Sequence, residues 1–255
     1  MAFTAKDDLT AKDRFVLVLV KLERAKNHLK NFETSAEVWR DKYLQVIKTD
    51  VDPKTGKETR SFKTPPLASF ELLAIAGDVL QNLRSALDHL AFQLVEAGQG
   101  RPVGTRRGKR IGFPIFDMAK DYEALKTGKI KGARKSAIKA IDALKPYKRR
   151  NGTLWMIHYF NNIDKHRQLI TIGHAYLFEG EGFYGPYFRQ AARPLFEGIF
   201  GPEVNDNSKL VIGKSLGQPK IGKRQPLLPF LREAVKCVEA IVTAFEPHLR
   251  PRTRR

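Results

Sequence analysis

One face of a predicted helix carries hydrogen-bonding side chains where an ordinary solvent face would carry Lys and Glu. Asp, Asn, Ser and His weaken a helix interior, which indicates a purpose other than helix stability. They follow one another at spacings of four, three, four and four residues, so consecutive side chains can touch. The row consists of Asp78, Asn82, Ser85, His89 and Gln93, with Gln81, Arg84 and Asp88 beside it. Two interpretations are open: hydrogen-bonding groups that line a cleft, or a surface helix with one Arg84–Asp88 ion pair.

An amphipathic helix from about Pro66 to Gly98 positions this row. Pro65-Pro66 precedes the segment and Gly98-Gln99-Gly100 ends it, as is typical of helix boundaries. On the opposite side, apolar residues recur with the period of a helix and form one broad stripe. Its members are Leu72, Val79, Leu83, Ala86, Leu87, Leu90 and Leu94. We expect the stripe to face the core.

A second polar cluster is predicted at the end of another helix, from about Leu154 to Asp164. If this helix continued, His166 and Arg167 would fall on its apolar face, so the helix ends there or these groups are paired inside. Both outcomes put a polar cluster near buried surface, although a simple cap of the helix end by His166 is an equal alternative. The candidates in this cluster are Asn162, Asp164, Lys165 and His166.

The remaining segments predict a helical bundle with some β structure. Apolar residues recur with a helical period from about Thr10 to Ile47, and a final helix is predicted from about Pro229 to His248. Residues 45 to 63 are typical of a hairpin, which we expect to project from the bundle. Other predicted elements are a basic helical pair at 118–127 and 133–145 and strand-like runs at 168–178 and 209–213.

The chain is expected to form one α+β domain, predominantly helical, over residues 1–249. Its helical core covers about 10–167 and its β-containing part about 168–249. A basic tail at 250–255 follows, which we expect to be disordered. The 255 residues, of which 42% are hydrophobic, suffice for one sizeable core.

Several protein classes are disfavoured by the sequence. No run of eighteen apolar residues exists, and the N-terminus lacks the basic-then-apolar order of a signal peptide. The lone Cys237 can form neither an internal disulfide nor a cysteine-based zinc site, and we expect it to fill the core. These features favour a soluble, cytoplasmic protein with no membrane partner.

The net charge of +19 is concentrated in one fifth of the chain. Residues 101–150 contain sixteen Lys or Arg and four Asp or Glu. Solvated lysines alone could produce such a run, but a balanced surface mixes signs, so a polyanion partner, RNA or DNA, is favoured. The residues predicted to bind nucleic acid are Arg106, Arg107, Lys109, Arg110, Lys131, Arg134, Lys135, Arg149 and Arg150. The tail either adds phosphate contacts or only aids solubility.

The segment Arg84-Ser85-Ala86-Leu87-Asp88-His89 resembles the motif of HEPN-domain ribonucleases, in which four to six residues separate an Arg from a His. The motif lies inside a strong helix, as it does in that family, and the helical, basic, cysteine-poor context is similar too. The chain also resembles a group of bacterial proteins of unknown function that share three segments, here Arg84 to Leu90, Phe113-Pro114 and Asn162 to Arg167. This second resemblance covers about residues 78–170 and suggests that the two polar helices meet.

The HEPN resemblance implies an endoribonuclease that uses no metal and no cofactor. The ribose 2′-hydroxyl would attack its own phosphodiester, His89 would move protons, and Arg84 would stabilise charge on the phosphate. Asp88 or Asn82 would orient the imidazole, and Asp164 with the two residues after it would position substrate. Family members usually pair two such helices across a homodimer, which would place two Arg/His sets around one phosphate.

Other functions are open beside this one. A metal site could use Asp78, His89, Asp164 and His166, although no metal-binding motif supports it. A Ser-His-Asp hydrolase built on Ser85 lacks the glycines of a nucleophile elbow. A non-catalytic nucleic-acid-binding protein explains the charge as well as a nuclease does, and in that case the polar helices are structural or form a protein interface.

Overall fold

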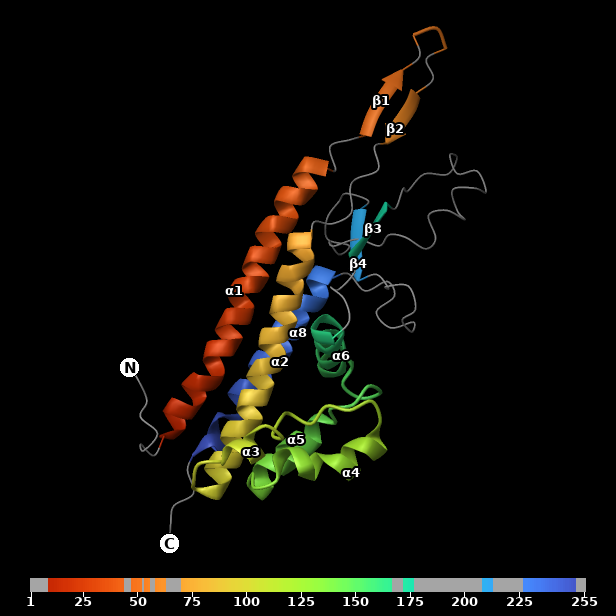
Figure 1. Cartoon of the computed structure of the whole chain (residues 1–255). Helices are drawn as coiled ribbons and strands as arrows, with labels where there is room; N and C mark the ends of the chain where they lie inside the picture. The colour runs from red at the N-terminus through yellow and green to blue at the C-terminus, as the bar shows by residue number, and fades with distance from the viewer. Residues whose placement is uncertain are drawn as a thin grey trace. The chain divides into compact units, whose positions relative to one another are not determined.

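Helices dominate the computed structural model, and their packing forms the core (Figure 1). The structure describes residues 9–43, 47–51, 53–55, 58–62, 70–166, 172–176, 208–212 and 227–250. The chain divides into two compact units, of which the first consists of Met1–Asn27, Gly77–Arg167 and Leu231–Arg255. The second consists of His28–Ala76 and Gln168–Phe230. The predominantly helical fold is confirmed, and the organisation as a single domain stays a prediction.

Three long helices bury much of the apolar surface. They are α1 (Ala11–Tyr43), α2 (Phe70–Gln99) and α8 (Leu227–Phe245), and a 3-10 helix at Glu246–Leu249 follows the last. The predicted stripe of α2 is buried along its length, with no member more than 1% exposed. Burial of a large apolar side chain stabilises by about 1.5–3 kcal/mol, so packing rather than intrinsic propensity fixes this helix.

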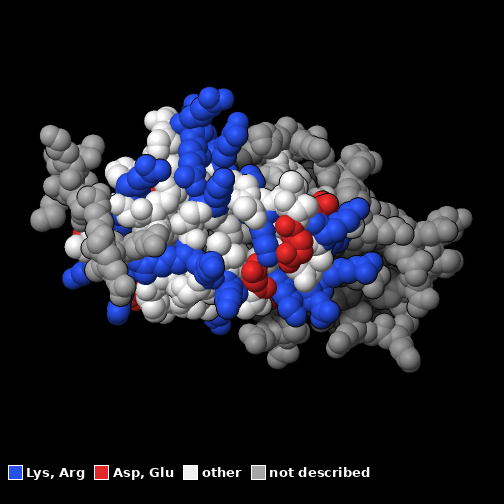
Figure 2. Space-filling model, turned by 90° about the horizontal axis from the view of Figure 1, so that it is seen from below, with Lys and Arg blue, Asp and Glu red and all other residues white. Residues whose placement is uncertain are grey.

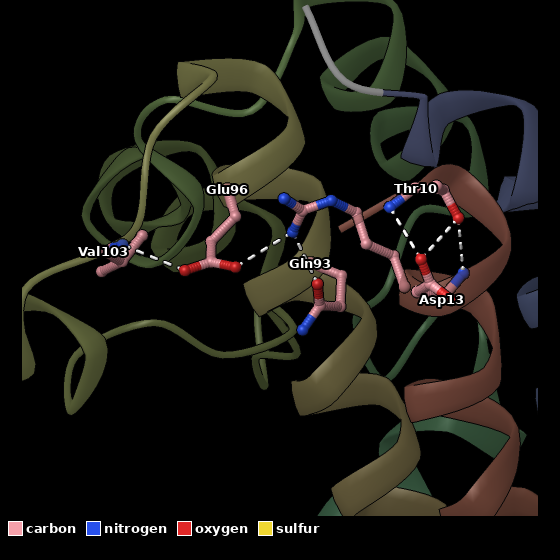
Figure 3. A network of polar contacts seen from close by, with 6 residues as sticks. Thr10, Asp13, Gln93, Glu96 and Val103 are labelled. Atoms are coloured by element: carbon pink, nitrogen blue, oxygen red, sulfur yellow. Dashed lines mark hydrogen bonds and ion pairs between the residues drawn. The ribbon is translucent and has the colours of Figure 1, made fainter. Parts of the chain in front are cut away.

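A reciprocal cap begins α1 (Figure 3). Asp13 Oδ2 accepts hydrogen bonds from the Thr10 backbone N–H at 2.9 Å and from the Thr10 hydroxyl at 2.6 Å. The Asp13 backbone N–H donates in return to Thr10 Oγ1 at 3.2 Å. Two N–H groups that a helix start leaves unpaired are thereby satisfied. The same bonds lower the pKa of Asp13.

A buried polar contact joins α1 to α2, and its dashed bonds can be followed in Figure 3. Arg14 Nη1 donates to Gln93 Oε1 at 2.8 Å and to Glu96 Oε2 at 3.0 Å. The other oxygen of Glu96 accepts the Val103 backbone N–H at 3.0 Å. Arg14 is 8% exposed and Gln93 is 5% exposed. The last member of the polar row therefore pairs inside a helix contact and does not line an open cleft.

The basic stretch contains three shorter helices, α3 (Thr105–Gly108), α4 (Ala119–Ile130) and α5 (Lys135–Leu144), and the second polar helix is α6 (Gly152–His166). The predicted basic helical pair corresponds to α4 and α5. Asp142 on α5 accepts hydrogen bonds from the Tyr122 hydroxyl at 2.6 Å and from Lys126 Nζ at 2.7 Å, both on α4. These bonds tie the two helices together.

Two antiparallel strand pairs lie in the second unit. β1 (Ile47–Val51) pairs with β2 (Glu58–Phe62), in the segment where the sequence predicts a hairpin. β3 (Ile172–Tyr176) pairs with β4 (Ser208–Ile212). The expected projection of the hairpin from the helices stays a prediction, and residues 251–255 of the basic tail lie outside the described part of the chain. None of the described helices is both long and apolar enough to span a membrane.

Candidate functional site

The guanidinium of Arg84 is enclosed between α2 and the Phe-Pro segment. Arg84 Nη2 donates to Asp88 Oδ1 at 2.8 Å and to the Phe113 carbonyl at 2.9 Å. The same carboxylate oxygen of Asp88 accepts the Phe113 backbone N–H at 2.9 Å. We call this set of three the Arg84 clamp, because it holds both polar backbone groups of Phe113. Only 11% of the Arg84 side chain is exposed, against 38% of the Asp88 side chain, so the cation of this pair is well shielded and the carboxylate is partly open to solvent.

The clamp depends on close approach of the loop to α2. A Cβ at Gly112 would lie 2.9 Å from Asp88 Oδ1, so the absence of a side chain there lets the backbone reach the carboxylate. Burial lowers the pKa of Arg84, and the negative charge of Asp88 opposes that change. Arg84 Nη1 is buried and has no hydrogen-bond partner. The guanidinium therefore faces protein and is not presented to a phosphate at the surface.

His89 is not a member of the clamp. It is exposed, and no described hydrogen bond or ion pair joins it to Arg84. Part of the ring is shielded from water, which lowers its pKa; the positive charge of Lys21 lowers it further, while Asp88 opposes both effects. The imidazole of His89 is therefore mostly neutral at pH 7.

The other members of the polar row also differ in how far they are exposed to solvent. Asn82 is 9% exposed, and its Nδ2 donates to the Asp78 carbonyl at 2.8 Å, so part of its amide is used inside the helix. Ser85 is half-buried, whereas the Asp78 side chain is exposed. Both buried and exposed groups occur along the row, and the Arg84–Asp88 ion pair of the second interpretation is present.

The two polar helices meet, as the second resemblance suggests. Gly77 on α2 lies directly against the Asp164 carboxylate of α6, where a Cβ would be 2.8 Å from Oδ1. Asn161 is 2% exposed, and Asn162 Nδ2 lies 3.1 Å from His158 Nε2. The side chains of the other two predicted members of this cluster, Lys165 and His166, lie outside the described residues.

His158 on α6 is not among the residues that the sequence singles out. Burial lowers its pKa to about 4, the positive charges of Arg84 and Lys129 add to the shift, and Asp117 opposes it. Its Nδ1 is buried without a hydrogen-bond partner. The available signal was its position four residues before Asn162, which puts both on one face. The imidazole is neutral at pH 7 and lies near two cations.

The predicted nucleic-acid-binding residues are divided between surface and structural roles. Most are exposed, and Figure 2 shows Lys and Arg spread widely over the face seen from below, with Asp and Glu in fewer places. Arg107 and Arg134 are half-buried, and each donates to a backbone carbonyl, of Lys131 and Arg250 respectively. The exposed members are Arg106, Lys109, Arg110, Lys131, Lys135, Arg149 and Arg150.

Among the described side chains, no group of three or more His, Cys, Asp or Glu could hold a metal ion. Comparison with protein-family models, with curated proteins and with solved structures finds no match to the chain. The described residues form a predominantly helical fold, and most of the predicted nucleic-acid-binding residues are exposed on it.

Proposed function

We propose that the chain binds nucleic acid, RNA before DNA, through the exposed basic residues of the stretch 101–150. The proposal rests on a difference between the acidic and the basic residues of this stretch. Asp142 is engaged by Tyr122 and Lys126, and Asp117 accepts the Trp155 indole N–H at 2.6 Å. The stretch contains only four carboxylates for sixteen Lys or Arg, so most of its positive charge is not neutralised within it.

Several exposed cations, in contrast, are available to bind a partner. Among the described residues, no ion pair engages Lys131, Lys135, Arg149 or Arg150. A phosphate backbone that replaces its condensed counterions with such side chains gains affinity from counterion release. Phosphate contacts of this kind position the partner without reading its sequence. The preference for RNA is taken from the HEPN resemblance.

The test is a fluorescence anisotropy titration of a labelled mixed-sequence RNA and of DNA of the same sequence. The variant replaces Lys131, Arg149 and Arg150 together with Ser, and the control replaces Arg24, an exposed cation on α1, with Ser. We expect RNA affinity to fall at least about tenfold in the triple variant and to stay unchanged in the control. Equal affinity of the triple variant and the wild type, or no binding by the wild type, would refute the proposal.

Metal-independent RNA cleavage by a homodimer is a second candidate function. The observation that favours it is the exposed His89, whose lowered pKa leaves a neutral imidazole that can accept a proton at pH 7. Asp88, which the clamp holds, lies next to it in the sequence. In this arrangement Arg84 is a positioning residue for Asp88 rather than a direct phosphate ligand.

Cleavage of the same RNA in EDTA tests this second candidate. We expect His89→Ala to abolish EDTA-resistant cleavage while circular dichroism shows an intact fold. Arg84→Ala, checked in the same way, should reduce cleavage as well. Binding without cleavage by the wild type would leave only the first proposal, and cleavage that persists in folded His89→Ala would exclude His89 as the proton carrier.

A further inference from the structure

Two half-buried aromatic residues, Phe116 and Tyr147, lie beside a basic turn of the chain. The turn has the sequence Lys145-Pro146-Tyr147-Lys148-Arg149-Arg150, and Tyr147 is bridged to Phe116 through the hydrogen bond from Phe116 N to the Pro146 carbonyl at 3.1 Å. Both rings pack on the buried Tyr122, with centroid distances of 6.2 Å for Phe116 and 6.0 Å for Tyr147. Neither ring is fully covered by protein.

The backbone of this turn is fixed by its own hydrogen bonds. The Tyr147 carbonyl accepts the N–H groups of Arg150 at 2.9 Å and of Asn151 at 3.0 Å. Lys145 ends α5 in the left-handed region, with φ of 47°, and its N–H donates to the Asp142 carbonyl at 3.1 Å. A turn held in this way presents its side chains without a large loss of conformational entropy on binding.

Positive charge surrounds the two rings. Lys145, Lys148, Arg149 and Arg150 are exposed, and none forms an ion pair with a described carboxylate. Lys148 Nζ lies 4.6 Å from the centroid of the Trp155 ring, so this cation is held close to the turn without being neutralised. Aromatic faces flanked by cations are the combination with which proteins bind unpaired nucleobases and their phosphates.

We propose that this turn and Phe116 form a site for single-stranded RNA, an inference that rests on the proposed nucleic-acid binding. An unpaired base stacks on the accessible part of Tyr147 and Phe116, and the neighbouring phosphates contact Lys148, Arg149 and Arg150. A duplex keeps its bases stacked inside the helix, so it offers the phosphates without the ring contact. The substrate class is therefore RNA with unpaired bases rather than uniform duplex.

Anisotropy titrations with one labelled RNA strand, free and annealed to its complement, test this site. We expect the wild type to bind the single strand more tightly than the duplex. Tyr147→Leu, which keeps an apolar side chain over Tyr122, should lose about 5- to 100-fold in single-strand affinity and leave duplex affinity unchanged. Tyr147→Phe is the matched control and should bind as the wild type does, and Phe116→Leu should repeat the loss.

The possible results distinguish the stacking site from nucleic-acid binding in general. Binding of both RNA forms by the wild type, with Tyr147→Leu and Phe116→Leu unaffected on the single strand, would overturn the stacking site and leave nucleic-acid binding standing. Equal losses on single strand and duplex would also overturn it, since they would indicate a damaged fold or a phosphate effect. No binding of either form by the wild type would refute the proposed function and this inference with it.

Discussion

Asp88 pairs with the largely buried Arg84 cation and satisfies a backbone N–H that would otherwise be buried without a partner. One oxygen of its carboxylate accepts hydrogen bonds from the Arg84 guanidinium and from the Phe113 backbone N–H. We expect Asp88→Ala to lower the free energy of unfolding by about 1.5–3 kcal/mol, because it leaves a shielded cation unpaired and an N–H unsatisfied. Urea unfolding followed by circular dichroism measures the loss.

Asp88→Asn separates the two contributions of that carboxylate. The amide oxygen can still accept the Phe113 N–H, whereas the charge that pairs with Arg84 is lost. The Asn variant should therefore lie between the wild type and the Ala variant in stability. Equal stability of the Ala variant and the wild type would show that the clamp contributes nothing to the fold.

His158 should make the fold sensitive to acid. Its pKa is lowered to about 4 by burial and by the nearby Arg84 and Lys129, whereas an unfolded chain has a His pKa near 6.5. Between these values the unfolded state binds a proton that the folded state does not, so the free energy of unfolding falls as the pH falls. We expect a loss of roughly 2 kcal/mol between pH 7 and pH 4.5 from this residue.

Carboxylates titrate over part of the same range, so the measurement compares two proteins. His158→Gln cannot be protonated and keeps an oxygen that can accept from Asn162. Urea unfolding at several pH values should show a flatter dependence on pH for the variant, with the two proteins close at pH 7.5. Parallel curves for the wild type and the variant would contradict the lowered pKa.

At the scale of elements, the glycines near the end of α2 have separate functions that the sequence did not distinguish. The pattern Gly98-Gln99-Gly100 predicts a helix end, and Gly100, with φ of 64°, fulfils that role. Gly98 lies inside the last turn, where a Cβ would be 2.2 Å from the Gly132 carbonyl oxygen. Close approach of two backbones, rather than termination of the helix, requires glycine at this position.

Gly98→Ala should therefore destabilise the fold although Ala favours helix. The gain in helix propensity is about 1 kcal/mol, whereas overpacking against a backbone typically costs about 1–3 kcal/mol and here meets an atom that cannot rotate away. Gly128→Ala in α4 is the control, because a Cβ there meets nothing within 4 Å, and it should stabilise slightly. Thermal unfolding of the pair tests the sign, and a stabilised Gly98→Ala would contradict the contact.

Periodicity predicted the helices well because burial of an apolar stripe is a local sequence property. The long helix predicted from Thr10 to Ile47 runs over Ala11–Tyr43, and the stripe of α2 is buried as expected. The polar side of α2 was harder to predict, since its state depends on which residues of other elements reach it. Gln93 is buried because Arg14 reaches it from α1, and no pattern in α2 alone shows this.

The candidate site, too, could be predicted from the sequence only in part. Spacing along the helix correctly paired Arg84 with Asp88, one turn apart. The contact with the Phe113 backbone joins residues that are distant in sequence, so it required the fold. The role that the HEPN resemblance implies for Arg84, direct stabilisation of a phosphate, stays a prediction, and the enclosed guanidinium favours a positioning role.

At the scale of the whole molecule, the charge distribution predicts how binding responds to salt. Each phosphate neutralised by a Lys or Arg of the protein releases condensed counterions, so the logarithm of the association constant falls linearly with the logarithm of salt concentration. The slope is about −0.7 per phosphate contact on a single strand. Because most of the predicted nucleic-acid-binding residues are exposed, and Lys and Arg are spread widely over the face that Figure 2 shows, we expect several contacts and a steep slope.

The slope distinguishes phosphate contacts from base contacts. Arg149→Ser with Arg150→Ser should make the slope shallower by roughly 1.4, which is about 0.7 for each lost contact. Tyr147→Leu should reduce affinity by a similar factor at every salt concentration and leave the slope unchanged, since stacking on a ring releases no counterion. Titrations between low and moderate salt measure both quantities. A slope that the Arg variant does not change would mean that these two residues do not contact phosphate, however strongly they affect affinity.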